Sequence, residues 1–188
     1  MGYRMPETWQ GRISTLGGLG FLTGMPGTVG SVAAFLVAMV HPVPLWIILP
    51  AAALSVWASE SYARQEGRED PPEVVADEVV GMWLALWGLP LGYGLPALFL
   101  FRVIDIIKPI PVSTAEKLPG GWGIVADDVV GGLMTNALIR GVSWLFLGGL
   151  FHQVCCDSEL RRGHYGKKKH TRQQERAKFI YRWGEACL

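Results

Sequence analysis

Long uncharged stretches interrupted by proline and glycine constrain this chain more than any other feature. Residues 28–59 and 79–101 contain no Asp, Glu, Lys or Arg, and residues 129–151 contain only Arg140. Half of the 188 residues are hydrophobic and 18% are charged, which is below the roughly 25% charged residues of an ordinary soluble domain. No alternation with the period of a strand persists along the chain, so we expect an all-α fold.

Proline and glycine divide these stretches into short helices. Residues 41–44 (HPVP) separate 28–40 from 45–59, and each piece is about 20 Å long at 1.5 Å per residue, short of a ~30 Å bilayer core. Glycines and prolines in 88–96 make 79–101 either a broken helix or two helices joined by a turn. The sequence predicts a single compact helical bundle embedded in a membrane, and the alternative is the core of a soluble bundle.

The two ends of the chain differ in charge. Residues 1–151 carry 8 basic and 12 acidic residues, whereas residues 152–188 carry 9 basic and 4 acidic residues. The basic tail either attracts anionic lipid headgroups or forms a disordered, peripheral segment. All three cysteines lie in this tail without CxxC spacing, which predicts free thiols and neither a disulfide framework nor a zinc site.

A carboxylate pair occurs twice, fifty residues apart. Residues 75–81 (VADEVVG) recur as 125–131 (VADDVVG). Each pair is predicted to open an apolar helix, where the helix dipole stabilises carboxylates, and the Gly four residues after the first carboxylate leaves room on the same face for an ion or a phosphate oxygen. Carboxylate oxygens select hard cations such as Mg²⁺. The repeat therefore predicts either one shared metal site or two ordinary helix caps.

Two further segments carry residues suited to phosphate. Arg102, Asp105 and Lys108 follow one another at i+3 spacing, as in a salt-bridge ladder or a phosphate-binding face. Residues 24–31 (GMPGTVGS) form a Gly-rich turn that leads into a helix, which offers backbone N–H groups to an anion or is a plain helix cap. The loop 120–123 (GGWG) is similarly a turn or a close approach to substrate.

In this order, residues 24–31, 77–81 (DEVVG), 101–111 (FRVIDIIKPIP) and 120–132 (GGWGIVADDVVGG) resemble the phosphatidylglycerophosphatase A family. The resemblance covers residues 13–151, which we expect to form the catalytic domain, and does not extend to the tail 152–188. It implies a Mg²⁺-dependent phosphatase of phospholipid biosynthesis that converts phosphatidylglycerophosphate to phosphatidylglycerol and phosphate at a bacterial cytoplasmic membrane. It also implies no nucleic-acid partner, and it leaves the oligomeric state open.

Matching the motifs residue by residue predicts three overlapping sets of site residues. In-line attack by a Mg²⁺-activated water and an aspartyl-phosphate intermediate are both compatible with these sets. The predicted catalytic residues are Asp77, Asp105, Asp127 and Asp128; the substrate-binding residues are Gly27, Thr28, Arg102 and Lys108; and the metal ligands are Asp77, Glu78, Asp127 and Asp128.

A topology model supports this grouping. All four motifs face the cytoplasm if the membrane crossings are 28–40, 45–59, 79–91, 95–107 and 128–151. The same model places the basic tail on the opposite side, against the positive-inside tendency. Two other functions remain open on the residues alone: a membrane transport protein with intramembrane charges, and a soluble phosphatase acting on a small phosphate ester.

Overall fold

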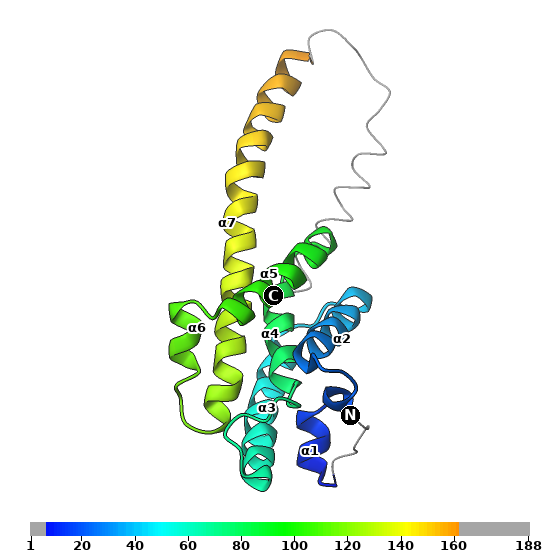
Figure 1. The fold of residues 1–188 in the computed structure, drawn as a ribbon. Coiled ribbons are helices and arrows are strands. Elements are labelled where there is room, and N and C mark those ends of the chain that lie inside the picture. Colours follow the sequence, from blue (N-terminus) through cyan, green and yellow to red (C-terminus); the bar gives the residue numbers. More distant parts are fainter. Residues whose placement is uncertain (1–6, 162–188) are drawn as a thin grey trace. The chain divides into compact units, whose positions relative to one another are not determined.

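The computed structural model describes residues 7–161, with side chains described as far as residue 145. These residues form helices and no strand, so the predicted all-α class is confirmed (Figure 1). The elements are α1 Trp9–Ser14, η1 Leu19–Phe21, α2 Pro26–Val40, α3 Leu45–Glu66, α4 Ala76–Leu86, η2 Leu91–Tyr93, α5 Gly94–Ile107, α6 Ile110–Ala115 and α7 Gly121–Arg161.

The chain divides into two compact units, residues 1–136 and residues 137–188. The first unit contains all four motifs. The second begins within α7, whose backbone continues as a helix to Arg161, so residues 152–161 of the expected tail are helical. The rest of the tail, residues 162–188, lies outside the described residues.

Helix ends follow the local chemistry of the sequence. Pro26 occupies the first turn of α2, where its missing N–H is not needed. Gly67 ends α3 with φ +65°, a conformation that costs glycine little. Between α4 and α5, Gly88 has φ +64° and is followed by η2. The interrupted stretch is therefore two helices joined by a turn.

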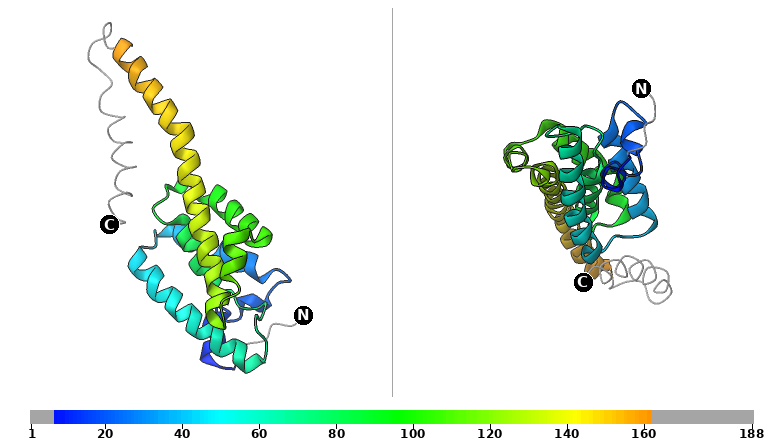
Figure 2. Two further views of the ribbon diagram at one scale, coloured as in Figure 1. Left: turned by 90° about the vertical axis from the view of Figure 1, so that its left-hand side faces the viewer. Right: turned by 90° about the horizontal axis from the view of Figure 1, so that it is seen from below.

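The central element of the first unit is α4, which packs against α2, α3 and α5 (Figures 1 and 2). Its side chains are almost all buried, and Met82 and Ala85 are fully buried. The N-terminal half of α7 also contacts the end of α4. The side-chain amide of Asn136 donates to the carbonyl oxygens of Ala85 (3.1 Å) and Trp87 (2.8 Å). The acidic pair at the start of α4 is consequently held in the interior of the unit.

Among the described residues, no helix is both long enough and apolar enough to cross a membrane.

Candidate active site

The Gly-rich turn before α2 lies directly against the first carboxylate pair. A Cβ atom added at Gly27 would overlap Glu78 Oε1 and would lie 3.0 Å from Arg102 Nη1. A Cβ atom at Gly30 would lie 3.3 Å from the Glu78 Cβ atom. These glycines therefore let the first turn of α2, which includes the half-buried Thr28, approach α4 and α5 closely.

Glu78 is the centre of a network of hydrogen bonds and ion pairs. Its Oε2 atom accepts hydrogen bonds from Ser31 Oγ (2.5 Å) and Arg102 Nη1 (2.6 Å). Arg102 also pairs with Asp105 Oδ2 at 2.9 Å, so one guanidinium bridges two carboxylates. Burial raises the pKa of Glu78, although Arg102 and the Ser31 hydroxyl act in the opposite direction.

Lys108 ends α5 in a left-handed conformation, with φ +46° and ψ 64°. The helix cannot continue past it because Pro109 follows. Of the two i+3 pairs of a salt-bridge ladder, Arg102–Asp105 forms, whereas the ion pairs of Lys108 run to Glu116 and Asp127. The Lys108 ammonium group donates to Glu116 Oε1 (2.7 Å) and Asp127 Oδ2 (3.0 Å). Burial alone would lower the pKa of Lys108, but the hydrogen bonds to Glu116 and Asp127 outweigh it and raise the pKa.

Asp77 and Asp128 are the least compensated carboxylates of the site. They are 9% and 4% exposed, and Asp77 Oδ1 has no hydrogen-bond partner. Burial raises the pKa of both groups well above the usual range of a carboxyl group. Among the charged neighbours of Asp128, Asp77 raises its pKa the most. Two buried carboxylates that repel each other in this way mark a place where a cation would be stabilised.

A close helix crossing brings these two carboxylates together. A Cβ atom added at Gly132 would lie 2.2 Å from the Gly81 carbonyl oxygen, and one at Gly81 would lie 2.7 Å from the Asp128 carbonyl oxygen. The two copies of the acidic repeat therefore meet where α4 and α7 touch. Gly81 and Gly132 allow the two helix backbones to touch. The prediction of free space beside Gly81 is wrong, because Phe101 and the Asp128 backbone occupy that space.

The second acidic pair does not open its helix. α7 begins at Gly121, so Asp127 and Asp128 lie beyond its first turn, which contains no acidic residue. Gly120, with φ +62°, sets this earlier start. Gly121 packs on the Val56 carbonyl, which would be 2.3 Å from an added Cβ atom. The helix-dipole reason for placing acids there therefore applies only to Asp77 and Glu78.

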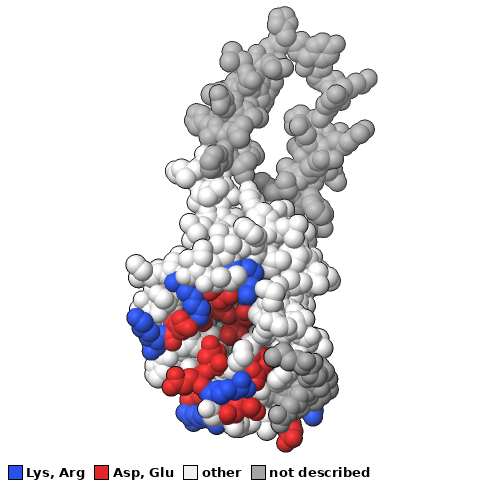
Figure 3. Space-filling view, in the orientation of Figure 1, with Lys and Arg blue, Asp and Glu red and all other residues white. Residues whose placement is uncertain are grey.

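Every predicted site residue thus lies in one part of the first unit. On the face shown in Figure 3, acidic and basic side chains lie next to one another. Sequence reasoning missed three polar neighbours of the site: Ser31, Glu116 and Asp70. Ser31 belongs to the motif 24–31, so the sequence did offer a signal for it. Glu116 lies eight residues after its partner Lys108. Asp70 is near Lys108, which lowers the pKa of Asp70 while burial raises it.

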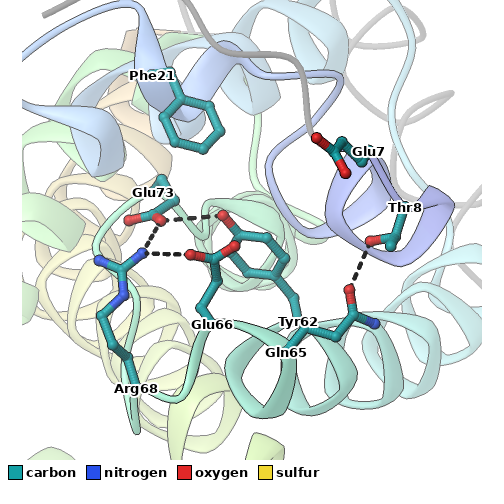
Figure 4. Close-up of a pocket in the computed structure, with 8 residues that line it drawn as sticks. All are labelled: Glu7, Thr8, Phe21, Tyr62, Gln65, Glu66, Arg68 and Glu73. Carbon is teal, nitrogen blue, oxygen red and sulfur yellow. Dashed lines mark hydrogen bonds and ion pairs between the residues drawn. The ribbon is translucent and has the colours of Figure 1, made fainter.

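A pocket of about 240 Å³ contains none of the motif residues (Figure 4). Among its lining residues, the Tyr62 hydroxyl donates to Glu73 Oε1 at 3.0 Å, and Arg68 also donates to this carboxylate. Burial and the nearby Glu73 raise the pKa of Tyr62. These polar groups pair with one another, and their hydrogen bonds connect α3 to the loop before α4. The pocket is therefore not a candidate active site.

The residues present fit a hard cation in the chemistry of their donor atoms. Within the described side chains, no three or more His, Cys, Asp or Glu residues are grouped as a metal site. Mg²⁺, however, commonly takes one or two carboxylates and completes its shell with waters and substrate phosphate oxygens. Asp77 and Asp128 supply such a pair, and the unpartnered Asp77 Oδ1 atom is the observation that favours it.

Comparison with known proteins assigns the family. The family model described as phosphatidylglycerophosphatase A matches residues 12–143, which contain the whole site. The chain belongs to the phosphatidylglycerophosphatase A family. Phosphatidylglycerophosphatase A of Escherichia coli is 30% identical over 142 residues (64% of this chain and 78% of that protein), and that of Haemophilus influenzae is 29% identical over 140 residues (69% and 86%).

A Bacteroides thetaiotaomicron protein named "Putative phosphatidylinositol-3-phosphatase" is 34% identical over 152 residues, which is 71% of this chain and 92% of that protein. No solved structure is significantly similar to the chain. The family confirms the predicted enzyme class, a phosphatase of phospholipid metabolism, and the predicted dephosphorylation of phosphatidylglycerophosphate.

Proposed function

We propose that the chain hydrolyses the terminal phosphate monoester of phosphatidylglycerophosphate with Mg²⁺ held by Asp77 and Asp128. The single observation that carries the metal assignment is the buried, unpartnered Asp77 Oδ1 atom beside a second buried carboxylate. When bound, the ion supplies positive charge to the phosphoryl oxygens and lowers the pKa of a water. Glu78 and Asp127, predicted as ligands from sequence, act here through Arg102 and Lys108.

The two basic residues neutralise the phosphoryl group. Arg102 and Lys108 each bridge two carboxylates, Glu78 with Asp105 and Glu116 with Asp127. A phosphate dianion competes for these donors, and the carboxylates keep both side chains oriented before substrate binds. Arg102 suits bidentate contact with two phosphate oxygens, and Lys108 acts as a point charge. The N–H groups of the first α2 turn at Gly27 and Thr28 lie beside Arg102 and add uncharged donors.

Asp105 is the proposed general base. Arg102 engages its Oδ2 atom at 2.9 Å, and the other carboxylate oxygen accepts the proton of the attacking water. The water oxygen forms the new bond to phosphorus, the bond from phosphorus to the glycerol oxygen breaks, and the leaving oxygen takes a proton from solvent. Asp105→Asn should therefore lower kcat with little change in KM.

The substrate is a phospholipid, and we propose that the first unit associates with the membrane that contains it. Large apolar side chains are exposed on α2 and α5, which contact each other: Leu36 (57%), Val40 (85%), Leu95 (69%) and Phe99 (73%). Exposed apolar groups in this number are typical of a lipid or protein interface. The proposed location is the bacterial cytoplasmic membrane, with the acidic site facing the cytoplasm. Flotation of the chain with liposomes tests the association.

Phosphate release from phosphatidylglycerophosphate, with phosphatidylinositol 3-phosphate as the comparison substrate, tests the function. We expect release that requires Mg²⁺ and is lost in Asp77→Asn and Asp128→Asn while both variants remain folded. Full release in excess chelator would refute the metal assignment. Radioactive phosphate retained on the protein after acid quenching would replace direct water attack by an aspartyl-phosphate route.

A further inference from the structure

We infer that the acyl chains of the bound substrate lie along the outer face that α2 and α5 form together. This inference rests on the proposed function and extends it. Membrane association concerns the first unit as a whole, whereas this face is assigned to the hydrocarbon of the one lipid molecule whose phosphate is at Arg102. The acyl chains belong to the same molecule as that phosphate, so they need apolar surface that begins at the site.

Contacts at two places determine how α2 and α5 run. A Cβ atom added at Gly27 would lie 3.0 Å from Arg102 Nη1. A Cβ atom added at Gly94 would lie 2.9 Å from the Phe35 ring and 3.0 Å from the Met39 methyl group. The start of α2 is thus beside the last turns of α5, and the start of α5 is beside the second half of α2. The two helices run antiparallel, and the acidic site is at one end of the pair.

Both helices bury one side against α4. In α2, Ala34 is buried, and its carbonyl oxygen accepts a hydrogen bond from the Trp83 indole of α4 at 3.2 Å. In α5, Phe101 is fully buried, and its ring would lie 2.7 Å from a Cβ atom added at Gly81 of α4. The opposite sides of the two helices therefore form one outer face.

This outer face is apolar and uncharged until it reaches Arg102. Residues 26–40 and 94–101 contain no Asp, Glu, Lys or Arg. Leu95, Phe99 and Arg102 are spaced i, i+4 and i+7, so they lie on the same side of α5. The exposed large apolar side chains of the face are Val32, Leu36, Val40, Leu95 and Phe99. The apolar surface is therefore continuous with the cation that holds the phosphate.

The length of the face suits an acyl chain. From Gly27 to Val40, α2 extends about 20 Å at 1.5 Å per residue. Half of a ~30 Å hydrocarbon core is about 15 Å, so an acyl chain can follow the face through one leaflet while its phosphate stays at Arg102. A second copy of the chain on this face would separate Arg102 from the hydrocarbon. The lipid is therefore the occupant that the catalytic site favours.

A photoactivatable substrate locates the acyl chains. The probe is phosphatidylglycerophosphate with a diazirine in one acyl chain, present in small amount in phosphatidylcholine vesicles with the full chain carrying Asp105→Asn, so that the lipid is not consumed. We expect covalent label on α2 and α5, and an excess of unlabelled phosphatidylglycerophosphate should remove most of it. Phosphatidylcholine with the same diazirine should give label that this competitor does not remove.

Leu36→Asp and Leu49→Asp are a matched pair of variants. The two leucines are similarly exposed, 57% and 61%, but Leu49 lies on α3, outside the α2–α5 pair. In detergent micelles, Leu36→Asp should raise KM for phosphatidylglycerophosphate about 10-fold or more, because a carboxylate against hydrocarbon is costly. KM for the same headgroup without acyl chains should not change. Leu49→Asp should change neither value.

Several outcomes would overturn the assignment. Label on α2 and α5 that unlabelled phosphatidylglycerophosphate does not remove would assign the face to bulk lipid, and absence of label there would assign it to another occupant, such as a second copy of the chain. An unchanged KM in Leu36→Asp, an equal rise in both variants, or an equal rise for the headgroup without acyl chains would also overturn it. A wild-type chain that releases no phosphate from phosphatidylglycerophosphate would instead overturn the proposed function.

Discussion

The contact between α4 and α7 can be tested with two neighbouring glycines. A Cβ atom at Gly132 would lie 2.2 Å from the Gly81 carbonyl oxygen, and real Cβ atoms essentially never approach within 3.0 Å, so Gly132→Ala must push the helices apart by about 0.8 Å. A Cβ atom at Gly131 meets only Ile104 and Phe101, each at the ordinary distance of 3.7 Å. The two substitutions add the same methyl group to the same helix.

Their effects on stability should therefore differ by the cost of the overpacked contact. Both variants gain about 0.5–1 kcal/mol from replacing a helical glycine by alanine. Gly132→Ala also incurs about 1–3 kcal/mol of overpacking. Since 1 kcal/mol corresponds to about 2–4 °C in a chain of this size, Gly132→Ala should melt several degrees below Gly131→Ala in a thermal unfolding experiment.

Their effects on catalysis should differ more strongly. Moving Asp128 away from Asp77 by close to 1 Å is a displacement that can cost about 100-fold in rate. Phosphate release should therefore fall by about that factor in Gly132→Ala and stay near wild type in Gly131→Ala. Equal melting temperatures and equal rates in the two variants would refute the argument that this crossing sets the distance between the carboxylates.

Four further predictions address the charged groups and the tail. Mg²⁺ should raise the melting temperature of the wild type, because it binds only the folded state, and the shift should disappear in Asp77→Asn. In chelator, the wild type should gain stability relative to Asp77→Asn as pH falls from neutral toward the ordinary carboxylate range. The reason is that a carboxyl group whose pKa is raised in the folded state contributes stability at low pH, and this contribution is lost as pH rises through the raised pKa. A stability difference between the two proteins that does not vary with pH would contradict the buried pair. Lys108→Ala should raise KM in the phosphate-release assay, and an unchanged KM would remove Lys108 from the phosphate site. Truncation after Phe151 should leave kcat unchanged, and its loss in a folded, membrane-bound protein would give the tail a role in the chemistry.

Helix boundaries were readable wherever proline or glycine interrupts an apolar stretch. The predicted helix over 95–107 corresponds to α5, Gly94–Ile107, and the break at 41–44 separates α2 from α3. The uncharged stretch 28–59 does not mark the end of α3, which continues through the charged residues to Glu66, with Tyr62 and Ala63 buried against the rest of the unit. Short α1 and α6 were also missed, since six residues carry too little periodicity to be recognised.

The sequence by itself determined the all-α class and the family, because these depend on local spacing and on motif order. It also named most of the charged residues that the fold brings together. Only the tertiary structure decided which carboxylates are partnered. Glu78 is satisfied because Ser31 and Arg102 arrive from α2 and α5, while Asp77 Oδ1 is left without a partner. The two residues are adjacent and chemically alike, so local sequence cannot separate them. The helices that pack against each carboxylate determine how far it is desolvated and which hydrogen-bond donors reach it. Both properties depend on contacts between residues far apart in the sequence.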